Sequence, residues 1–199
     1  MTKTVEFLYD FGSPNAYFAW RVLPGIAEKA GADLVLKPVL LGGVFKATGN
    51  QSPVMAYANV QGKLAYENLE MQRYIAKHGL TSFTFNPHFP QNSLLMMRAA
   101  MVAEAQSTLH PYTEACFKAM WEDGAKLDEP ETFVSVLTEA GLNGQALLEG
   151  AQDPAHKEAL KTATAQAVER GIFGVPTIFV GDDMYFGKER MGQIEEALA

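Results

Sequence analysis

The proline in the stretch FGVPTIFVGDD, residues 173–183, constrains the fold of this chain more than any other residue. Pro176 stands directly before the run Thr177-Ile178-Phe179-Val180, whose apolar and β-branched side chains predict a strand. A proline inside a sheet removes a ladder hydrogen bond. It therefore belongs at the first residue of a strand, at an edge, or where the backbone faces something other than a neighbouring strand. A ligand is one candidate for that partner.

The first forty residues predict a strand, a helix and a second strand. Residues 4–10 are rich in β-branched and aromatic side chains, as strands are. Ser13 as N-cap and Pro14 at the first helical position predict the start of a helix, and Gly31 predicts its end. The segment ADLVLKPVLL predicts the second strand. A helical crossover of this length pairs the two strands in parallel.

The rest of the chain predicts a loop, a long helical region and a final hairpin. The loop is GGVFKATGNQSPV, and the tail predicts two strands joined by a turn at 181–183 and a last helix. Between them, apolar spacing predicts helices over residues 55–79, 93–106, 110–123, 130–140 and 154–170. This order is that of an α/β thioredoxin-like fold. We expect residues 1–50 and 165–199 to form that domain, with residues 51–164 as an all-helical insertion.

Composition excludes several classes of protein. Cys116 is the only cysteine, so an internal disulfide and a cysteine-based metal cluster are excluded, and its helical context predicts a buried apolar role. The four histidines show no metal-ligand spacing, and no metal is expected. A net charge of −7 argues against a nucleic-acid partner. No apolar run is long enough to span a membrane and the N-terminus does not resemble a signal peptide, so a cytoplasmic location is expected.

A thioredoxin fold needs a reactive group where the first strand meets its helix and a proline before the third strand. Ser13-Pro14-Asn15-Ala16 occupies the first place and Val175-Pro176 the second. Ser13 and Ala16 stand where a Cys-x-x-Cys pair would be, and serine cannot cycle through a disulfide, so a thiol oxidoreductase is excluded. We expect Pro176 to be cis and the Val175 backbone to be free to pair with an extended peptide. The helix N-terminus favours a negative charge, which a ligand's thiolate would supply.

Four segments together resemble one known family, and the resemblance covers essentially the whole chain. The segments are FLYDFGSPNAYFAWRVLP, FKATGNQSP, FNPHFPQNSLLMMRAAMVAEAQ and RGIFGVPTIFVGDDMYFGKERMGQIEEAL. They resemble the 2-hydroxychromene-2-carboxylate isomerases and the kappa-class glutathione transferases. The three motifs D-F-x-S-P, F-G-V-P-T-x-F-V and F-G-x-x-R, found in this order, identify the family far more specifically than any one of them alone.

The resemblance implies a glutathione site. Its catalytic serine matches Ser13, which would hydrogen-bond the glutathione sulfur, and Val175 with Pro176 would pair with the tripeptide backbone. Asn50 matches a glutathione-contacting asparagine. Lys188 and Glu189 match the pair that holds the γ-glutamyl end, although the family has a small polar residue and an aspartate there.

Three further residues are weaker candidates from the same resemblance. Lys63 matches a lysine that would meet a carboxylate of glutathione or substrate, and Tyr17 and Asn92 are candidate substrate contacts. Simpler roles stay open for several of these positions: Ser13 alone is typical of an N-cap, Asn50 of a turn, and Lys63 of a solvated helix face.

The implied activity is glutathione-dependent cis–trans isomerisation of a small aromatic α-keto acid or its cyclic hemiketal, by a homodimer. Rotation about a conjugated double bond becomes easy when a thiolate adds to it reversibly, which is covalent catalysis with a borrowed nucleophile. Two alternatives stay open. One is a kappa-like glutathione transferase or peroxidase, and the other is a non-catalytic thioredoxin-fold module that binds extended peptides.

Overall fold

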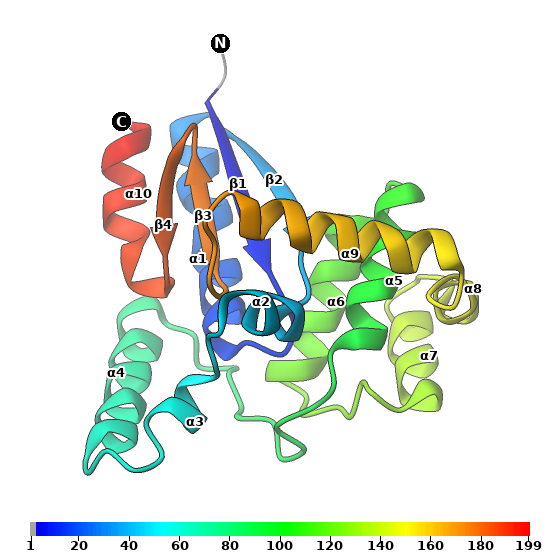
Figure 1. Cartoon of the computed structure of the whole chain (residues 1–199), viewed down its shortest axis with the longest axis horizontal. Helices are drawn as coiled ribbons and strands as arrows, with labels where there is room; N and C mark the ends of the chain where they lie inside the picture. The colour runs from blue at the N-terminus through cyan, green and yellow to red at the C-terminus, as the bar shows by residue number, and fades with distance from the viewer. Residues whose placement is uncertain (1–2) are drawn as a thin grey trace.

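The computed structural model describes residues 3–199 and confirms the thioredoxin-like sheet (Figure 1). Its strands are β1 (Thr4–Tyr9), β2 (Asp33–Pro38), β3 (Thr177–Val180) and β4 (Asp183–Phe186). They lie in the order β2-β1-β3-β4. β1 and β2 are parallel, while β3 is antiparallel to both β1 and β4. The predicted parallel pair and the final hairpin are therefore present, and β1 occupies the interior of the sheet.

The helix α1 (Pro14–Ala30) begins and ends where its capping residues predict. The Ser13 side chain accepts a hydrogen bond from the Ala16 N–H, and Pro14 occupies the first turn. Gly31 closes the helix in the left-handed conformation at φ 62°, where glycine carries no Cβ penalty, and its N–H reaches the carbonyls of Ala27 and Glu28. These caps fix the start of α1 at the end of β1.

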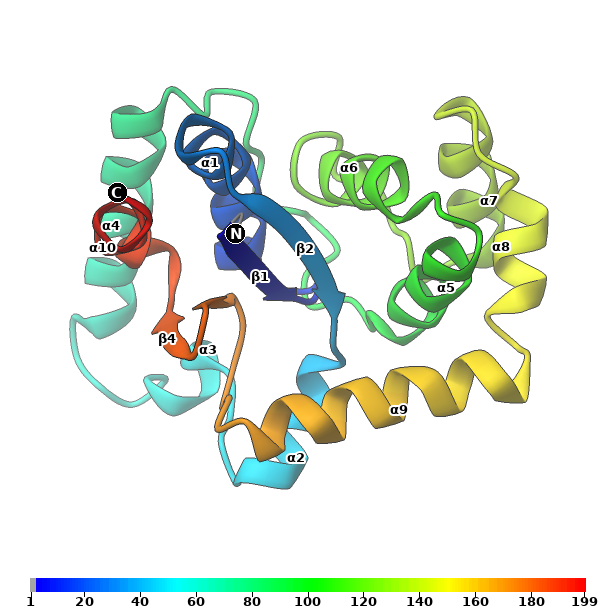
Figure 2. The same cartoon turned by 90° about the horizontal axis from the view of Figure 1, so that it is seen from above.

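The other helices surround the sheet on two sides (Figure 2). In chain order they are α2 (Leu41–Thr48), α3 (Pro53–Ala56), α4 (Lys63–His78), α5 (Leu94–Ala105), α6 (Leu109–Trp121), α7 (Pro130–Glu139), α8 (Gly144–Gly150), α9 (Pro154–Glu169), the 3₁₀ turn η1 (Lys188–Arg190) and α10 (Met191–Leu198). Seen from above, α5 to α8 gather beyond β2, while α4 and α10 lie on the side of β4. α9 leads from the helical group back to the sheet.

The helical region differs from the sequence prediction in three places. Residues 41–48 form α2 where a loop was expected, because Gly43 allows close packing: a Cβ there would lie 3.2 Å from the Thr164 methyl group on α9. α8 was not expected, and Asn143 caps it by accepting from the Ala146 N–H. The helix expected over 55–79 is split into α3 and α4, with Gly62 at φ 78° before α4.

One aromatic core joins the sheet to the helical region. Along β1 and its extension Phe7 stacks on Tyr9 and Tyr9 meets Phe11 edge to face, and Phe117 of α6 packs on Tyr9 and Phe11. The Trp121 indole N–H donates to the Phe11 carbonyl at 2.8 Å. All of these side chains are fully buried. The domain boundaries expected from the sequence stay a prediction, since this core runs across them.

Within residues 3–199 there is no helix with the length and apolar character that crossing a bilayer requires. The cytoplasmic location expected from the sequence stays a prediction.

The buried position of Cys116 generates the first test. Cys116 is fully buried in α6, and burial raises the pKa of its thiol to about 12. A thiol reagent such as dithionitrobenzoate needs both access and thiolate. We expect negligible labelling of the native protein at mildly alkaline pH and one equivalent per chain in concentrated guanidinium chloride. A Cys116→Ala control should give no signal under either condition, and rapid labelling of the native chain would contradict the structure.

Candidate active site

Ser13 lies at the junction of β1, α1 and the loop that carries Pro176. It is 7% exposed and caps α1, with its Oγ 3.3 Å from the Ala16 N–H. The hydroxyl donates to the Val175 carbonyl across a long 3.4 Å contact. The first turn of α1 contains no acidic residue, so no side chain there opposes the positive end of the helix dipole. The Ser13 hydroxyl and the helix end therefore suit an anionic ligand atom.

The loop before β3 places a cis peptide bond beside Ser13. Val175-Pro176 is cis, as the sequence predicts. The Thr177 hydroxyl donates to the Gly174 carbonyl at 2.8 Å, and the Gly187 N–H donates to the Pro176 carbonyl at 3.0 Å. Within residues 3–199 the Val175 N–H has no hydrogen-bond partner, and its carbonyl has only the long contact to Ser13. This backbone is available for an extended ligand.

Asn50 also contacts the loop that carries Val175 and Pro176, at Phe173. Its side-chain amide donates to the Phe173 carbonyl at 2.7 Å, and its Oδ1 accepts from the Gln51 N–H at 2.8 Å. The second bond is the turn role that the sequence left open. The first bond ties the segment after α2 to the loop of Val175, so Asn50 lies at the border of the Ser13 site.

Lys188 and Glu189 follow directly after Gly187, whose N–H holds the Pro176 carbonyl. The Lys188 side chain is almost wholly buried, its ammonium pairs with the Glu189 carboxylate, and it lies 5.5 Å from the centre of the Tyr74 ring. Glu189 is about half exposed, at 54% of its side chain. This ion pair is therefore connected to the Pro176 loop through Gly187, and its carboxylate faces solvent.

Two predicted residues lie outside this cluster of contacts. Lys63 is at the start of α4, paired with Glu67 at 2.5 Å and 4.9 Å from the centre of the Tyr57 ring. Asn92 is exposed before α5, where its Oδ1 accepts from the Leu94 N–H at 3.0 Å. No hydrogen bond or ion pair in residues 3–199 links either side chain to Ser13.

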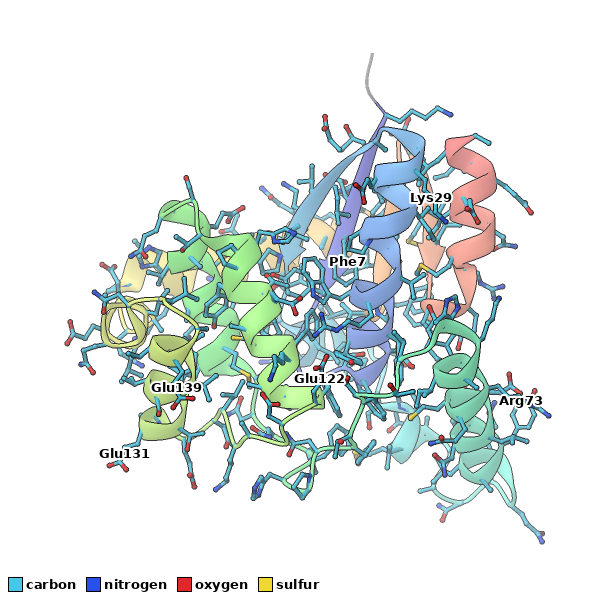
Figure 3. The ribbon with its side chains drawn as sticks, turned by 180° about the vertical axis from the view of Figure 1, so that it is seen from behind. Phe7, Lys29, Arg73, Glu122, Glu131 and Glu139 are labelled. Carbon is cyan, nitrogen blue, oxygen red and sulfur yellow. The ribbon has the colours of Figure 1, made fainter. Side chains whose placement is uncertain are left out.

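Tyr17 is enclosed in the core, one turn after Ser13. It is 1% exposed and packs against the rings of Phe83 and Phe117. Its hydroxyl donates to Glu122 at 3.0 Å, and burial raises the pKa of the phenol to about 12. Figure 3 shows Glu122 where the end of α6 approaches α1. In this structure the Tyr17 hydroxyl is engaged inside the protein.

The same region contains an ion-pair network that sequence reasoning missed. Arg21 of α1 pairs with Glu114 at 2.7 Å and with Glu122 at 2.6 Å, and the Trp20 indole donates to Glu114 at 2.8 Å. Pairs between helices so distant in sequence leave no local pattern. The network fixes α1, which carries Ser13 at its start, against α6.

Asp10 is the second residue that sequence reasoning missed, although it begins the D-F-G-S-P motif. Its carboxylate is fully buried and accepts from the Gly12 N–H at 2.8 Å, the Leu41 N–H at 2.8 Å and the Ser93 hydroxyl at 3.0 Å. Burial raises the pKa of this carboxyl, and the three hydrogen bonds oppose that shift. The bond to Gly12, two residues on, is an Asx turn, the one local signal that was available. Asp10 thus joins the Ser13 loop to the starts of α2 and α5.

Taken together, the donors and acceptors around Ser13 fit glutathione. A thiolate would meet the Ser13 hydroxyl and the N-terminus of α1, and an extended peptide backbone would meet the free Val175 backbone groups. The amine and carboxylate of a γ-glutamyl group would meet Glu189 and Lys188. In the structure Lys188 and Glu189 are paired with each other, so holding a γ-glutamyl group requires that pair to open.

Known proteins resemble this chain over nearly its whole length. The family model described as DSBA-like thioredoxin domain matches residues 4–199. A 2-hydroxychromene-2-carboxylate isomerase of Sphingobium xenophagum is 29% identical over 198 residues, which cover 100% of this chain and 99% of that protein. Glutathione S-transferase kappa 1 of Rattus norvegicus is 27% identical and covers 95% of this chain and 88% of its own.

Solved structures give the same relationship. A structure of a 2-hydroxychromene-2-carboxylate isomerase superposes with a TM-score of 0.85 at 29% identity, covering 98% of this chain and 94% of the other. A probable DsbA oxidoreductase from Streptomyces coelicolor superposes with a TM-score of 0.76 at 16% identity, covering 98% and 88%. The second likeness concerns the fold alone.

The Asp10 contacts generate the second test. An Asp10→Asn side chain keeps one acceptor oxygen and turns an NH₂ group toward a backbone or hydroxyl donor. A buried donor left without its acceptor costs roughly 1–3 kcal/mol, so we expect the free energy of unfolding to fall by about that amount. Urea denaturation followed by circular dichroism measures it. Asp182→Asn, in the exposed hairpin turn, is the matched control and should change stability by less than about 0.5 kcal/mol. Equal stability of the two variants would show that Asp10 does not hold the three segments.

Proposed function

The chain belongs to the DSBA-like thioredoxin domain family, matched over residues 4–199. We propose that it is a glutathione-dependent isomerase of the 2-hydroxychromene-2-carboxylate type. The observation that carries the proposal is the Ser13 hydroxyl at the start of α1, beside the free backbone of Val175. The full-length similarity to isomerases bearing that name supports it. The proposed substrate is a small aromatic α-keto acid or its cyclic hemiketal.

Bound glutathione supplies a thiol whose reversible addition to the conjugated double bond allows rotation about it. Ser13 donates a hydrogen bond to the sulfur and so favours its anionic form. The open N–H groups and the dipole of α1 act in the same direction. Both effects lower the thiol pKa toward neutrality, which is what a nucleophile formed at physiological pH requires.

The remaining residues orient the tripeptide. The Val175 N–H and C=O pair with its extended backbone next to Pro176. Lys188 and Glu189 bind the γ-glutamyl carboxylate and amine, which requires their mutual ion pair to open. Asn50 supports the loop from Phe173 and contacts the ligand from that side. Lys63 binds a carboxylate of glutathione or substrate after exchanging its partner Glu67.

The two candidate substrate residues, Asn92 and Tyr17, differ in their exposure. Asn92 is exposed and offers its amide to the α-keto acid. Tyr17 offers a substrate neither its hydroxyl, which donates to Glu122, nor its ring, which is 1% exposed, so its expected substrate contact is not supported by the structure. Phe173 and Phe186 form a tilted pair with centroids 4.5 Å apart, each 40% exposed, which adds aromatic surface next to the Pro176 loop.

We also propose that two copies of the chain associate. Most of the large apolar residues left exposed lie on α3, α4 and the loop between them, and a concentration of exposed apolar residues marks an interaction site. They are Val54, Met55, Tyr57, Val60, Leu64, Tyr66 and Leu69. Met55 is the most exposed of them, at 70%.

The activity test follows the absorbance change as 2-hydroxychromene-2-carboxylate equilibrates with trans-o-hydroxybenzylidenepyruvate, with and without glutathione. We expect acceleration only with glutathione. Ser13→Ala should lower kcat/KM roughly 10- to 100-fold, the equivalent of one charge-assisted hydrogen bond. Asn143→Ala removes an N-cap of the same kind from α8 and controls for lost helix stability, about 1 kcal/mol.

The other outcomes distinguish the alternatives. If glutathione shifts the melting temperature without isomerisation, a kappa-like transferase or peroxidase is favoured, and conjugation of an electrophile tests it. If glutathione has no effect of any kind, the peptide-binding module is favoured, and the isomerase proposal is wrong.

The association proposal is tested by size-exclusion chromatography with light scattering. We expect twice the chain mass of 21.7 kDa at micromolar concentration. Met55→Glu places a charge in the exposed apolar face and should shift the mass to that of a single chain. Glu131→Gln, on the distant helix α7, is the control (Figure 3). A single-chain mass for the unmodified protein would refute the proposal.

A further inference from the structure

A second cavity lies away from Ser13, between α2, α5 and α9. Figures 1 and 2 agree that α9 crosses beside α2 and in front of α5. The cavity has a volume of about 570 Å³, within the range of small-molecule sites. Its apolar lining comes from all three helices and includes Leu40, Ala47, Leu94, Leu160, Ala165 and Val168. Neither Ser13 nor Val175 nor Pro176 lines it.

Two cations without partners stand at this cavity. Arg98 of α5 and Lys157 of α9 are partly buried, and neither side chain forms a hydrogen bond or an ion pair with any part of the chain that the structure describes. Lys161, also at the cavity, is paired with Glu158 at 3.1 Å. Glu158 lines the cavity too, but it is the partner of Lys161, so three cations face one carboxylate there and two of them have no ion-pair partner in the described residues.

Arg98 also lines an adjoining cleft of about 280 Å³, which it shares with Asn92 and Gln152. Asp128 lines this cleft too, but its carboxylate lies beyond ion-pair distance of Arg98, and one of its oxygens is buried without a partner. The Arg98 guanidinium therefore stays available to bind an anion. Because Asp128 carries a negative charge, an anion is less favourable in the smaller cleft than in the larger cavity. An anionic group is best accommodated between Arg98 and Lys157, above the apolar lining.

The cavity is coupled to the Ser13 loop through its wall. The Leu40 N–H donates to the Thr164 hydroxyl at 3.0 Å, and both residues line the cavity. The next residue, Leu41, and the neighbour of Leu94, Ser93, both donate to Asp10, which also holds Gly12. A ligand that moves α2 or the start of α5 therefore acts on the loop that carries Ser13.

We infer that this cavity is a second binding site, for a small organic carboxylate with an apolar body, separate from the Ser13 site. The apolar lining takes the body of the ligand, and Arg98 and Lys157 take the carboxylate. A carboxylate is preferred because the guanidinium can bind its two oxygens at once. The inference does not rest on the proposed isomerase activity, since binding alone is what it states.

Isothermal titration calorimetry with 1-naphthoate tests it. We expect saturable binding by the unmodified chain, and weaker binding of the neutral analogue 1-naphthalenemethanol by roughly tenfold or more. Arg98→Gln should weaken 1-naphthoate binding by a similar factor. Ala165→Trp fills the cavity from the exposed face of α9 and should abolish binding. Lys77→Gln removes a charge of the same sign from α4 and should leave the dissociation constant within about twofold.

The variants also separate this cavity from other sites. Naphthoate bound at the Ser13 site would be insensitive to Arg98→Gln and Ala165→Trp, and unchanged binding in both variants overturns the inference. Equal affinity for the neutral analogue, or no saturable heat from 1-naphthoate, also overturns it. Circular dichroism and melting temperature establish that Ala165→Trp is folded. Arg98→Gln, a polar change at a partly buried side chain, provides the same test without filling the cavity.

Discussion

A carboxylate without access to water must find all its hydrogen-bond donors inside the protein, and Asp10 takes them from three segments that are distant in sequence. Leaving any of these groups unpaired in the interior would be costly. The three contacts are consequently expected to form cooperatively, so that Asp10 fixes the turn at Gly12, the start of α2 and the start of α5 relative to one another. Ser13 owes its position to this arrangement, because its own N–H is held by the Asp10 carbonyl at 3.1 Å.

Apolar packing is the second interaction that holds the sheet and the helical region together. The rings of Phe7, Tyr9 and Phe11 continue into Phe117 and Trp121 of the helical region. The thioredoxin-like sheet thus shares a single interior with the helical region. The Ser13 site lies where the polar contacts of Asp10 and this aromatic core meet, so the backbone of the Ser13 loop is held on both sides.

Local signals in the sequence predict local structure well. Ser13, Pro14 and Gly31 mark the ends of α1, and Pro176 marks the start of β3, because caps and prolines act through their immediate neighbours. α2 was not predictable in the same way, since its two glycines disfavour a helix and only the tertiary packing of α9 against Gly43 offsets this. Similarly, nothing near Tyr17 indicates that Glu122, 105 residues later, takes its hydroxyl.

The helix α9 packs against both the helical insertion and the sheet. It lies against α5 at the helical insertion and against α2 and β2 at the sheet, and its 16 residues make a rod of roughly 24 Å. Such a rod does not absorb displacement by bending, because each turn is bonded to the next. A shift of the insertion at Pro154 is therefore delivered at the other end, to Ala167 and Ile172, which pack in the same small cluster as Val175. A movement of the helical insertion is therefore transmitted through α9 to the loop that carries Val175 and Pro176.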